Sequence, residues 1–257
     1  MKKPYITIQK TAMMICSAAV ITALVLSVVL PLIFKAATVA ATGKLYPVYS
    51  VDTEEKKVAL GINCAWEDDD TDAFLKILKQ KQTKATFFVT GEFVQRCENA
   101  VVRISNAGHE IGNHSDSHPD MQTLNEEQIK KELNLAGNKI EKVTGIRPTL
   151  FRAPSGSYNT RLIKTANELG YHCIQWDCDT VDWKGHTADE MIQKVMKKLQ
   201  SGSILLLHLG AEHTAKALPM LIDAIKEKGY EIVPVSELIY TENYYVDRQG
   251  VQHEHEN

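Results

Sequence analysis

Acidic residues are absent from the first 50 positions of this 257-residue chain, which hold five lysines. The whole chain has a formal charge of −3, so subtracting the +5 of this first part leaves −8 for residues 51–257. Nucleic-acid-binding domains normally carry a strongly basic face. The mild acidity of the larger part therefore argues against a nucleic-acid partner.

Charged residues of either sign are absent from residues 11–34, which form an apolar run preceded by Lys2 and Lys3. A helix of about 20 apolar residues crosses a bilayer, and flanking positive charges stay on the cytoplasmic side. We predict a cytoplasmic N-terminus at residues 1–10 and an uncleaved, single-pass signal anchor in the cell membrane, with the rest of the chain extracellular. The alternative is a signal peptide that is cleaved within Val39–Gly43.

Cysteine is too scarce for a disulfide-stapled scaffold, because the chain has only five and one of them, Cys16, lies in the apolar run. We expect Cys173 and Cys178 to lie on one strand with side chains on opposite faces, since successive side chains alternate. Such a pair is poorly placed to form a disulfide, and both are interpreted as core thiols.

A glycine-rich phosphate loop is missing after the first predicted strand, which argues against a flat, doubly wound nucleotide-binding sheet. Instead, short apolar runs alternate with helical segments that end at glycine. We predict a distorted (β/α) barrel with about seven parallel strands over residues 56–240. Residues 35–55 are interpreted as a linker and residues 241–257 as a disordered polar tail. The predicted strands are 56–62, 84–90, 109–114, 149–154, 172–177, 203–208 and 230–235.

Polar side chains follow several predicted strands, where a barrel carries its chemistry. His114 and His118, four residues apart, could bind one metal ion. Arg152 places a fixed cation at the next strand end. His208 ends an apolar strand, and pairing with Asp182 would hold its imidazole for acid–base work. A histidine satisfied within the core is the alternative.

In sequence order, these residues lie in "HSDSH", "RAPSG", "DTVDW" and "LLH", accompanied by "KATFFVTG" and "AGHEIGNHS". Together the motifs resemble those of the polysaccharide deacetylase family (NodB homology domain), the metal-dependent carbohydrate esterases. The resemblance covers about residues 56–238. It implies a distorted barrel with fewer than eight strands, and a divalent metal, for which we expect zinc.

The first motif departs from the family pattern Thr-Phe-Asp-Asp-Gly, because Gly61-Ile-Asn-Cys-Ala65 fills it. The resemblance places Asn63 at the catalytic base and Cys64 at the third metal ligand, beside His114 and His118. An amide cannot accept a proton near neutral pH, whereas a thiolate is a good zinc ligand. A buried structural thiol is the alternative for Cys64.

Other family positions are interpreted in the same way. Arg152 would orient the base, and the backbone N–H of Ser155, which replaces the family's tyrosine, would hold an oxyanion. Trp66 and Trp183 are the expected substrate-binding residues, although Trp66 could simply pack. One of the acids in Glu67–Asp70, or Asp179, could replace the missing base, but an acidic helix start explains the former equally well.

The sequence therefore predicts a metal-dependent N-deacetylase of an N-acetylated cell-envelope glycan such as peptidoglycan, which hydrolyses a non-peptide C–N bond. His208, oriented by Asp182, would protonate the leaving amine. The alternatives are a glycan-binding relative that has lost catalysis through Asn63, and a deacetylase for another acylated sugar.

Overall fold

The computed structural model describes residues 43–67 and 69–255 of the chain. The predicted signal anchor, its flanks and Asp68 lie outside this part. Among the described residues, no helix combines the length and apolar character needed to span a bilayer. Leu45–Asn257 packs as one unit, so the domain begins about ten residues before the predicted boundary at 56.

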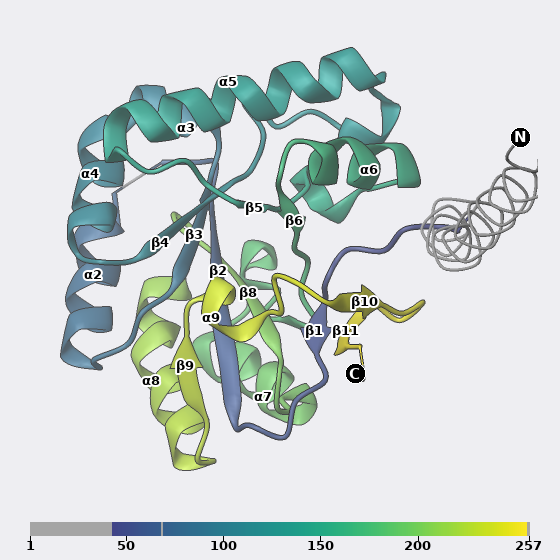
Figure 1. The fold of residues 1–257 in the computed structure, drawn as a ribbon. Helices are drawn as coiled ribbons and strands as arrows, with labels where there is room; N and C mark the ends of the chain where they lie inside the picture. Colours follow the sequence, from purple (N-terminus) through teal and green to yellow (C-terminus); the bar gives the residue numbers. More distant parts are fainter. Residues whose placement is uncertain (1–42, 68, 256–257) are drawn as a thin grey trace, which may run out of the picture. The chain divides into compact units, whose positions relative to one another are not determined.

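A curved sheet of parallel strands forms the centre of this unit (Figure 1). Seven strands follow the order β6-β5-β4-β3-β2-β8-β7, and β9 also pairs with β2. This arrangement confirms the predicted parallel, barrel-like sheet, and strands β6 and β7 are its two open ends. The strands are β2 (Lys57–Cys64), β3 (Thr86–Val89), β4 (Glu110–Asn113), β5 (Leu150–Phe151), β6 (His172–Cys173), β7 (Cys178–Asp179), β8 (Ile204–His208) and β9 (Glu231–Val233).

Helices surround the sheet on its outside (Figure 1). Asn125 and Thr187 cap α5 (Glu126–Thr144) and α7 (Ala188–Lys198) with complete capping boxes. Residues 91–106 form two helices, because Cys97 leaves helical geometry at φ −121° and ψ 41°. The helices are α2 (Thr71–Gln80), α3 (Gly91–Arg96), α4 (Glu98–Asn106), α5 (Glu126–Thr144), α6 (Thr160–Glu168), α7 (Ala188–Lys198), α8 (Thr214–Glu227) and α9 (Val235–Leu238).

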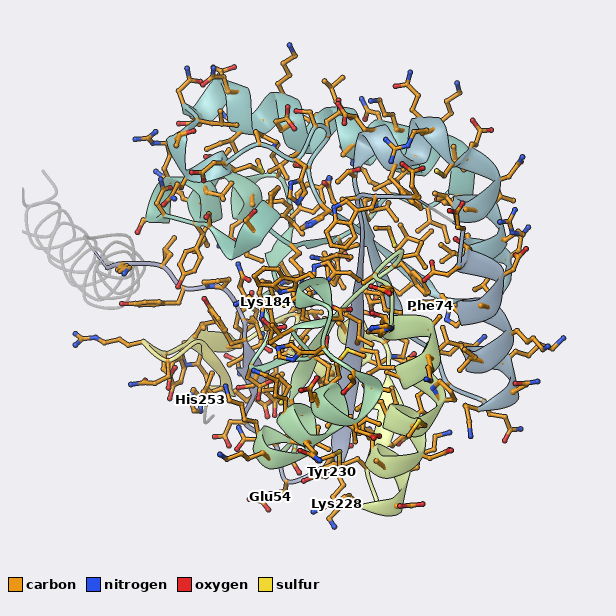
Figure 2. The ribbon with its side chains drawn as sticks, turned by 180° about the vertical axis from the view of Figure 1, so that it is seen from behind. Glu54, Phe74, Lys184, Lys228, Tyr230 and His253 are labelled. Carbon is orange, nitrogen blue, oxygen red and sulfur yellow. The ribbon has the colours of Figure 1, made fainter. Side chains whose placement is uncertain are left out.

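The main apolar core lies between the sheet and the helices. Strand β2 is buried along nearly its whole length, because helices cover one face and the barrel interior covers the other. Phe74 of α2 is fully buried in this core, whereas Lys228 at the end of α8 lies at the periphery (Figure 2). Burial on both faces explains why β2 and β8 read as continuous apolar runs.

The predicted strand 172–177 does not exist as one element. Cys173 in β6 pairs with Phe151 of β5, whereas Cys178 in β7 pairs with Leu205 of β8. The two cysteines therefore lie at opposite ends of the sheet order, and the prediction of a shared strand is wrong. Both thiols are buried, and burial raises the pKa of each to about 12, in agreement with core thiols.

The predicted disordered tail folds into a second small sheet. Strands β10 (Tyr244–Val246) and β11 (Val251–Glu254) pair antiparallel, and β11 pairs with β1 (Ser50–Val51). The side chain of Gln252 is fully buried and bonds the backbone N and O of Tyr240. The polar composition is misleading here, because the backbone pairs with a strand from the start of the domain.

Candidate active site

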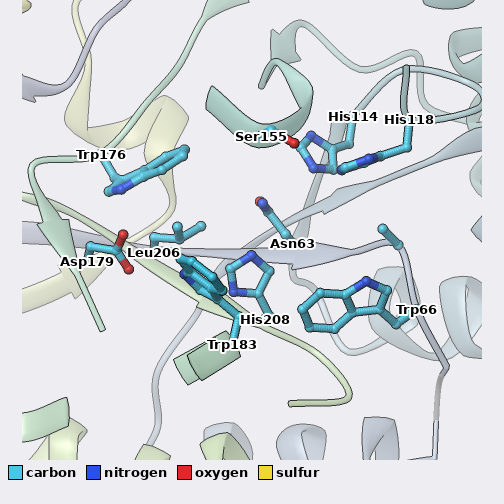
Figure 3. Close-up of a pocket in the computed structure, with 11 residues that line it drawn as sticks. Asn63, Trp66, His114, His118, Ser155, Trp176, Asp179, Trp183, Leu206 and His208 are labelled. Carbon is cyan, nitrogen blue, oxygen red and sulfur yellow. The ribbon is translucent and has the colours of Figure 1, made fainter. Parts of the chain in front are cut away.

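A cavity of about 350 Å³ opens at the carboxyl ends of the parallel strands. Figure 3 shows Asn63, His114 and His208 around this cavity, although they come from three separate strand ends. In the parallel register Asn63 of β2 pairs with His208 of β8, which brings these two positions side by side. The lining residues are Asn63, Ala65, Trp66, His114, His118, Ser155, Trp176, Asp179, Trp183, Leu206 and His208.

His208 is held by the buried carboxylate of Asp182. One oxygen of Asp182 lies 2.7 Å from Nδ1 of His208, and the other accepts the backbone N–H of His208 at 2.7 Å. The hydroxyl of Thr214 also donates to Asp182, at 2.8 Å. A carboxylate only accepts, so Nδ1 carries the proton and Nε2 is left for the cavity. The predicted pair is thus present with the geometry of an oriented imidazole.

Arg152 is a fully buried cation directly behind Asn63. Its Nη1 donates to the carbonyl of Gly61 and to Oδ1 of Asn63, each at 3.1 Å, and its Nη2 donates to the carbonyl of Gln175. Burial lowers the pKa of Arg152 to about 9, a change that the Asp179 carboxylate opposes. The guanidinium therefore stays charged at neutral pH and fixes the Asn63 side chain.

The two histidines of "HSDSH" lie next to each other, with ring centroids 5.1 Å apart. Nδ1 of His114 lies 2.7 Å from the carbonyl oxygen of Arg152, so this nitrogen carries the proton and Nε2 remains available. Burial lowers the pKa of both rings, that of His114 well below its usual value. Two neutral imidazoles are suitable metal ligands.

The structure does not bring Cys64 to these histidines. Side chains alternate along β2, so Asn63 faces the cavity and Cys64 faces the opposite side. Cys64 is fully buried in the apolar cluster that contains Phe93, and burial raises its pKa well above the usual range. This thiol remains protonated and is not a metal ligand in this arrangement, contrary to the sequence prediction.

The described residues therefore do not fit a catalytic metal site with three protein ligands. No group of three His, Cys, Asp or Glu side chains within residues 43–67 and 69–255 is arranged to hold a metal ion. The two histidines alone remain as donors. Such a pair lacks the third ligand that catalytic zinc sites use.

Aromatic side chains form much of the cavity wall. The indole of Trp66 stacks on the imidazole of His208, with centroids 5.1 Å apart and an interplanar angle of 22°. Trp183 also lines the cavity, as predicted, while Ser155 contributes from a turn where its own φ is 55°. Trp176 was missed by sequence reasoning, although all three tryptophans of the chain line this one cavity.

The candidate replacement bases have different locations. Asp179 lines the cavity, whereas Glu67, Asp69 and Asp70 are not among the lining residues. The carboxylate of Asp70 accepts the backbone N–H of Gly210, a structural role just before α2. Asp68 lies outside the described residues.

The model of the polysaccharide deacetylase family matches residues 50–174. The peptidoglycan-N-acetylmuramic acid deacetylase PdaA of Bacillus subtilis (strain 168) is 34% identical over 200 residues, which cover 75% of this chain and 74% of PdaA. This chain belongs to the polysaccharide deacetylase family.

Relatives that are named as deacetylases, as pseudoenzymes or as uncharacterised proteins resemble this chain to a similar degree. An uncharacterised Bacillus subtilis (strain 168) protein is 36% identical over 75% of this chain, which spans 60% of that protein. A CE4 family pseudoenzyme from Bacillus anthracis is 35% identical, with a TM-score of 0.73 over 81% of this chain and 73% of that protein. A mutant of a CE4 family pseudoenzyme with restored enzymatic activity gives the same TM-score. Proteins named as deacetylases and as pseudoenzymes thus both resemble this chain.

Of the His208 and Asn63 side chains in the cavity, only that of His208 can transfer a proton. His208 with Asp182 can give or take a proton at Nε2. Asn63 cannot accept one, because an amide is not basic near neutral pH. The cavity thus has an imidazole that can transfer a proton and an aromatic wall, but no carboxylate at position 63.

Proposed function

We propose that this protein binds the N-acetylated glycan of the bacterial cell wall in this cavity without efficient deacetylation. The observation that carries the proposal is Asn63. Its amide occupies the family's base position and is tied to Arg152 at 3.1 Å. The exposed aromatic faces of Trp66 and Trp183 (45% and 52% exposed) provide stacking surfaces for sugar rings.

Tryptophan fluorescence tests binding directly, because every tryptophan of the chain lines the cavity. The full-length protein is titrated with N-acetylated chito-oligosaccharides and solubilised peptidoglycan fragments, while acetate release is followed in parallel. We expect a saturable change in emission with no turnover. An unchanged emission up to millimolar glycan would overturn the proposal.

A matched pair of aromatic substitutions locates the binding surface. Trp183 and Tyr245 are similarly exposed (52% and 47%), but only Trp183 lines the cavity. Loss of a sugar–aromatic contact weakens binding, so Trp183→Ala should raise the Kd severalfold. Tyr245→Ala should leave it unchanged. Equal effects of both substitutions would place binding elsewhere.

A second candidate function is slow deacetylation, favoured by the Asp182–His208 pair with its 2.7 Å contact. Nε2 of His208 would take a proton from the attacking water and then give it to the leaving amine. General acid–base help is typically worth ~10²–10⁴-fold in rate, so His208→Ala should abolish any acetate release. Activity that appears only in Asn63→Asp would support the binding role for the native chain, whereas native turnover that depends on His208 would establish the deacetylase.

We also propose that residues 11–34 anchor the protein in the cell membrane with its C-terminal domain outside. The support is their apolar composition and the lysines that precede them. Full-length protein should fractionate with membranes and be digested by external protease. A mature form that begins within Val39–Gly43 would replace the anchor with a cleaved signal peptide.

A further inference from the structure

A second cavity, of about 540 Å³, opens near the amino ends of strands β3 and β4. Its walls come from the last turns of α2, the loop before β3 and the residues between α4 and β4. The candidate active site lies at the carboxyl ends of the strands instead, and the two cavities share no lining residue. This second cavity, the lysine pocket, is lined by Leu75, Lys76, Leu78, Lys79, Gln82, Thr83, Lys84, Ala107 and His109.

The lysine pocket is positively charged, although the domain around it is acidic. Lys76, Lys79 and Lys84 line it, and no Asp or Glu is among its described lining residues. Residues 73–91 contain four lysines, three of which are these, and no acid, whereas residues 51–257 contain more acids than bases in total. The charge of the pocket therefore favours an anionic ligand.

These positive charges have no anionic partner in the part of the chain that the structure describes. Nζ of Lys84 donates to the backbone carbonyl of Ala107 at 2.5 Å, and a carbonyl carries no net charge. Lys76 and Lys79 are exposed and make neither a hydrogen bond nor an ion pair with a described residue. A favourable position near a helix C-terminus explains Lys79, which lies in the last turn of α2, but it does not explain the whole set.

The histidine in the wall adds a hydrogen-bond donor and no negative charge. Nδ1 of His109 accepts the backbone N–H of Ala85 at 3.3 Å, so Nε2 carries the proton and can only donate. Burial and the nearby charge of Lys84 lower the pKa of this ring to about 4, which keeps it neutral at pH 7. Apolar wall beside these polar groups comes from Leu75, Leu78 and Ala107. The pocket therefore matches an anionic group on a small organic body.

The kind of cation indicates the kind of anion. Every cation of the lining is a lysine, which acts as a point charge, whereas the planar fork of arginine matches a single planar carboxylate. Three positive charges without an acid also suit a dianion better than a monoanion. Phosphate monoesters are mostly dianions at pH 7, because their second pKa is about 6. We propose that the lysine pocket binds the phosphate monoester of a small polyol or sugar, with the phosphate among Lys76, Lys79 and Lys84.

Isothermal titration calorimetry of the full-length protein with glycerol 3-phosphate tests this site. Glycerol lacks the phosphate, and glycerate carries a carboxylate instead. We expect saturable binding of glycerol 3-phosphate, no binding of glycerol, and at least roughly 10-fold weaker binding of glycerate, because fewer charge-assisted hydrogen bonds form. The affinity should fall as NaCl is raised, since salt screens exposed charges. Absence of binding, or equal binding of glycerate, would overturn the proposal.

Two pairs of lysines with the same helical spacing provide matched variants. Lys76 and Lys79 of α2 are three residues apart, as are Lys194 and Lys197 of α7, which are also exposed but do not line the pocket. Lys76→Ala combined with Lys79→Ala should raise the Kd for glycerol 3-phosphate at least roughly 10-fold. Lys194→Ala combined with Lys197→Ala removes the same charge and should leave the Kd unchanged. Equal weakening by both pairs would show a general charge effect and overturn the site.

The ring of His109 reports on the pocket in the unmodified protein. Its ¹H–¹⁵N NMR signals should shift on saturation with glycerol 3-phosphate, while those of His186, which does not line the pocket, should stay in place. Unshifted His109 signals in a saturated complex would place binding elsewhere and overturn the proposal.

A soluble lipid distinguishes the two sources of such a phosphate. Dihexanoyl phosphatidic acid carries the same phosphate monoester as glycerol 3-phosphate, together with two short acyl chains. Tighter binding of this lipid would support the proposal with a lipid headgroup as the ligand. Equal or weaker binding would support it with a free phosphate ester as the ligand.

Discussion

Replacing Asn63 by aspartate should stabilise the fold, because Arg152 is a fully buried cation without a carboxylate partner in the described part of the chain. Its nitrogens donate only to two backbone carbonyls and the Asn63 amide. Its charged plane packs 4.1 Å from the ring centroid of Phe88, and its Nε has no hydrogen-bond partner. Burial under these conditions disfavours the charged form, which is why the pKa of Arg152 falls to about 9.

The size of the effect follows from the energetics of buried pairs. Removing one partner of such a pair typically costs about 3–5 kcal/mol, since the other charge is left uncompensated. Supplying the missing carboxylate should return part of this amount, reduced by the cost of burying the new charge at a position that is 6% exposed. We expect a gain of about 2–3 kcal/mol, which corresponds to a rise in Tm of roughly 5–10 °C for a domain of this size.

The gain should depend on pH in a defined direction. Arg152 would hold the pKa of the new aspartate below its unfolded value of about 3.9. The added stability is therefore complete above pH 4 and is lost as the pH falls through the lower, folded-state pKa. Thermal unfolding followed by circular dichroism should show the full gain at pH 7 and a smaller gain at pH 3.

Two controls separate this pairing from a general effect of added negative charge. Asn138→Asp makes an exposed pair with Arg147, and such pairs contribute at most about 1 kcal/mol. In an Arg152→Met background, Asn63→Asp should give no gain. A Tm for Asn63→Asp at or below that of the native protein at pH 7 would refute the reasoning.

Three further perturbations have definite expected outcomes. Burial lowers the pKa of His109 to about 4, so the unfolded state takes up its proton at a higher pH than the folded state does. The unfolding free energy should therefore fall by up to about 1.4 kcal/mol per pH unit as pH drops from 6.5 to 4. In His109→Gln, urea unfolding should show a weaker dependence of this free energy on pH, and an unchanged dependence would contradict the lowered pKa of His109. Deleting residues 241–257 removes the two hydrogen bonds between the Gln252 side chain and the backbone of Tyr240. The unfolding free energy should therefore fall by at least about 2 kcal/mol. An unchanged Tm would show that these residues do not stabilise the domain. A methyl group at Gly61 would overlap the guanidinium of Arg152, so Gly61→Ala should cost about 1–3 kcal/mol in calorimetry, and a neutral result would show that Arg152 can move.

Local sequence patterns determined much of the architecture. Apolar runs between glycine-terminated helical segments predict a parallel sheet, and the structure has one. The strand-end residues His114 and His208 line one cavity, and Arg152 lies next to it behind Asn63. This works because parallel strands present their carboxyl ends at one edge, so polar residues after different strands converge without any knowledge of the detailed packing.

Tertiary structure alone decided the features that depend on distant partners. The chain from Cys173 to Cys178 is apolar enough for one strand, yet its ends pair with β5 and β8 at opposite ends of the sheet order. Residues 241–257 read as a polar tail, yet β11 finds a partner in β1, about 200 residues earlier. Backbone pairing of this kind leaves little trace in side-chain composition.

The first motif contains both a feature that the sequence predicts and a feature that only the tertiary structure fixes. Sequence places Asn63 and Cys64 at a strand end beside the predicted histidines, but it does not state which side chain faces the cavity. The register of β2 against β8 turns Asn63 toward His208 and Cys64 into the apolar core. Because side chains alternate along a strand, a shift of one residue would decide whether Cys64 is a metal ligand in the cavity or a thiol in the core. The direction of its side chain is fixed only by the pairing of strands that are far apart in the chain.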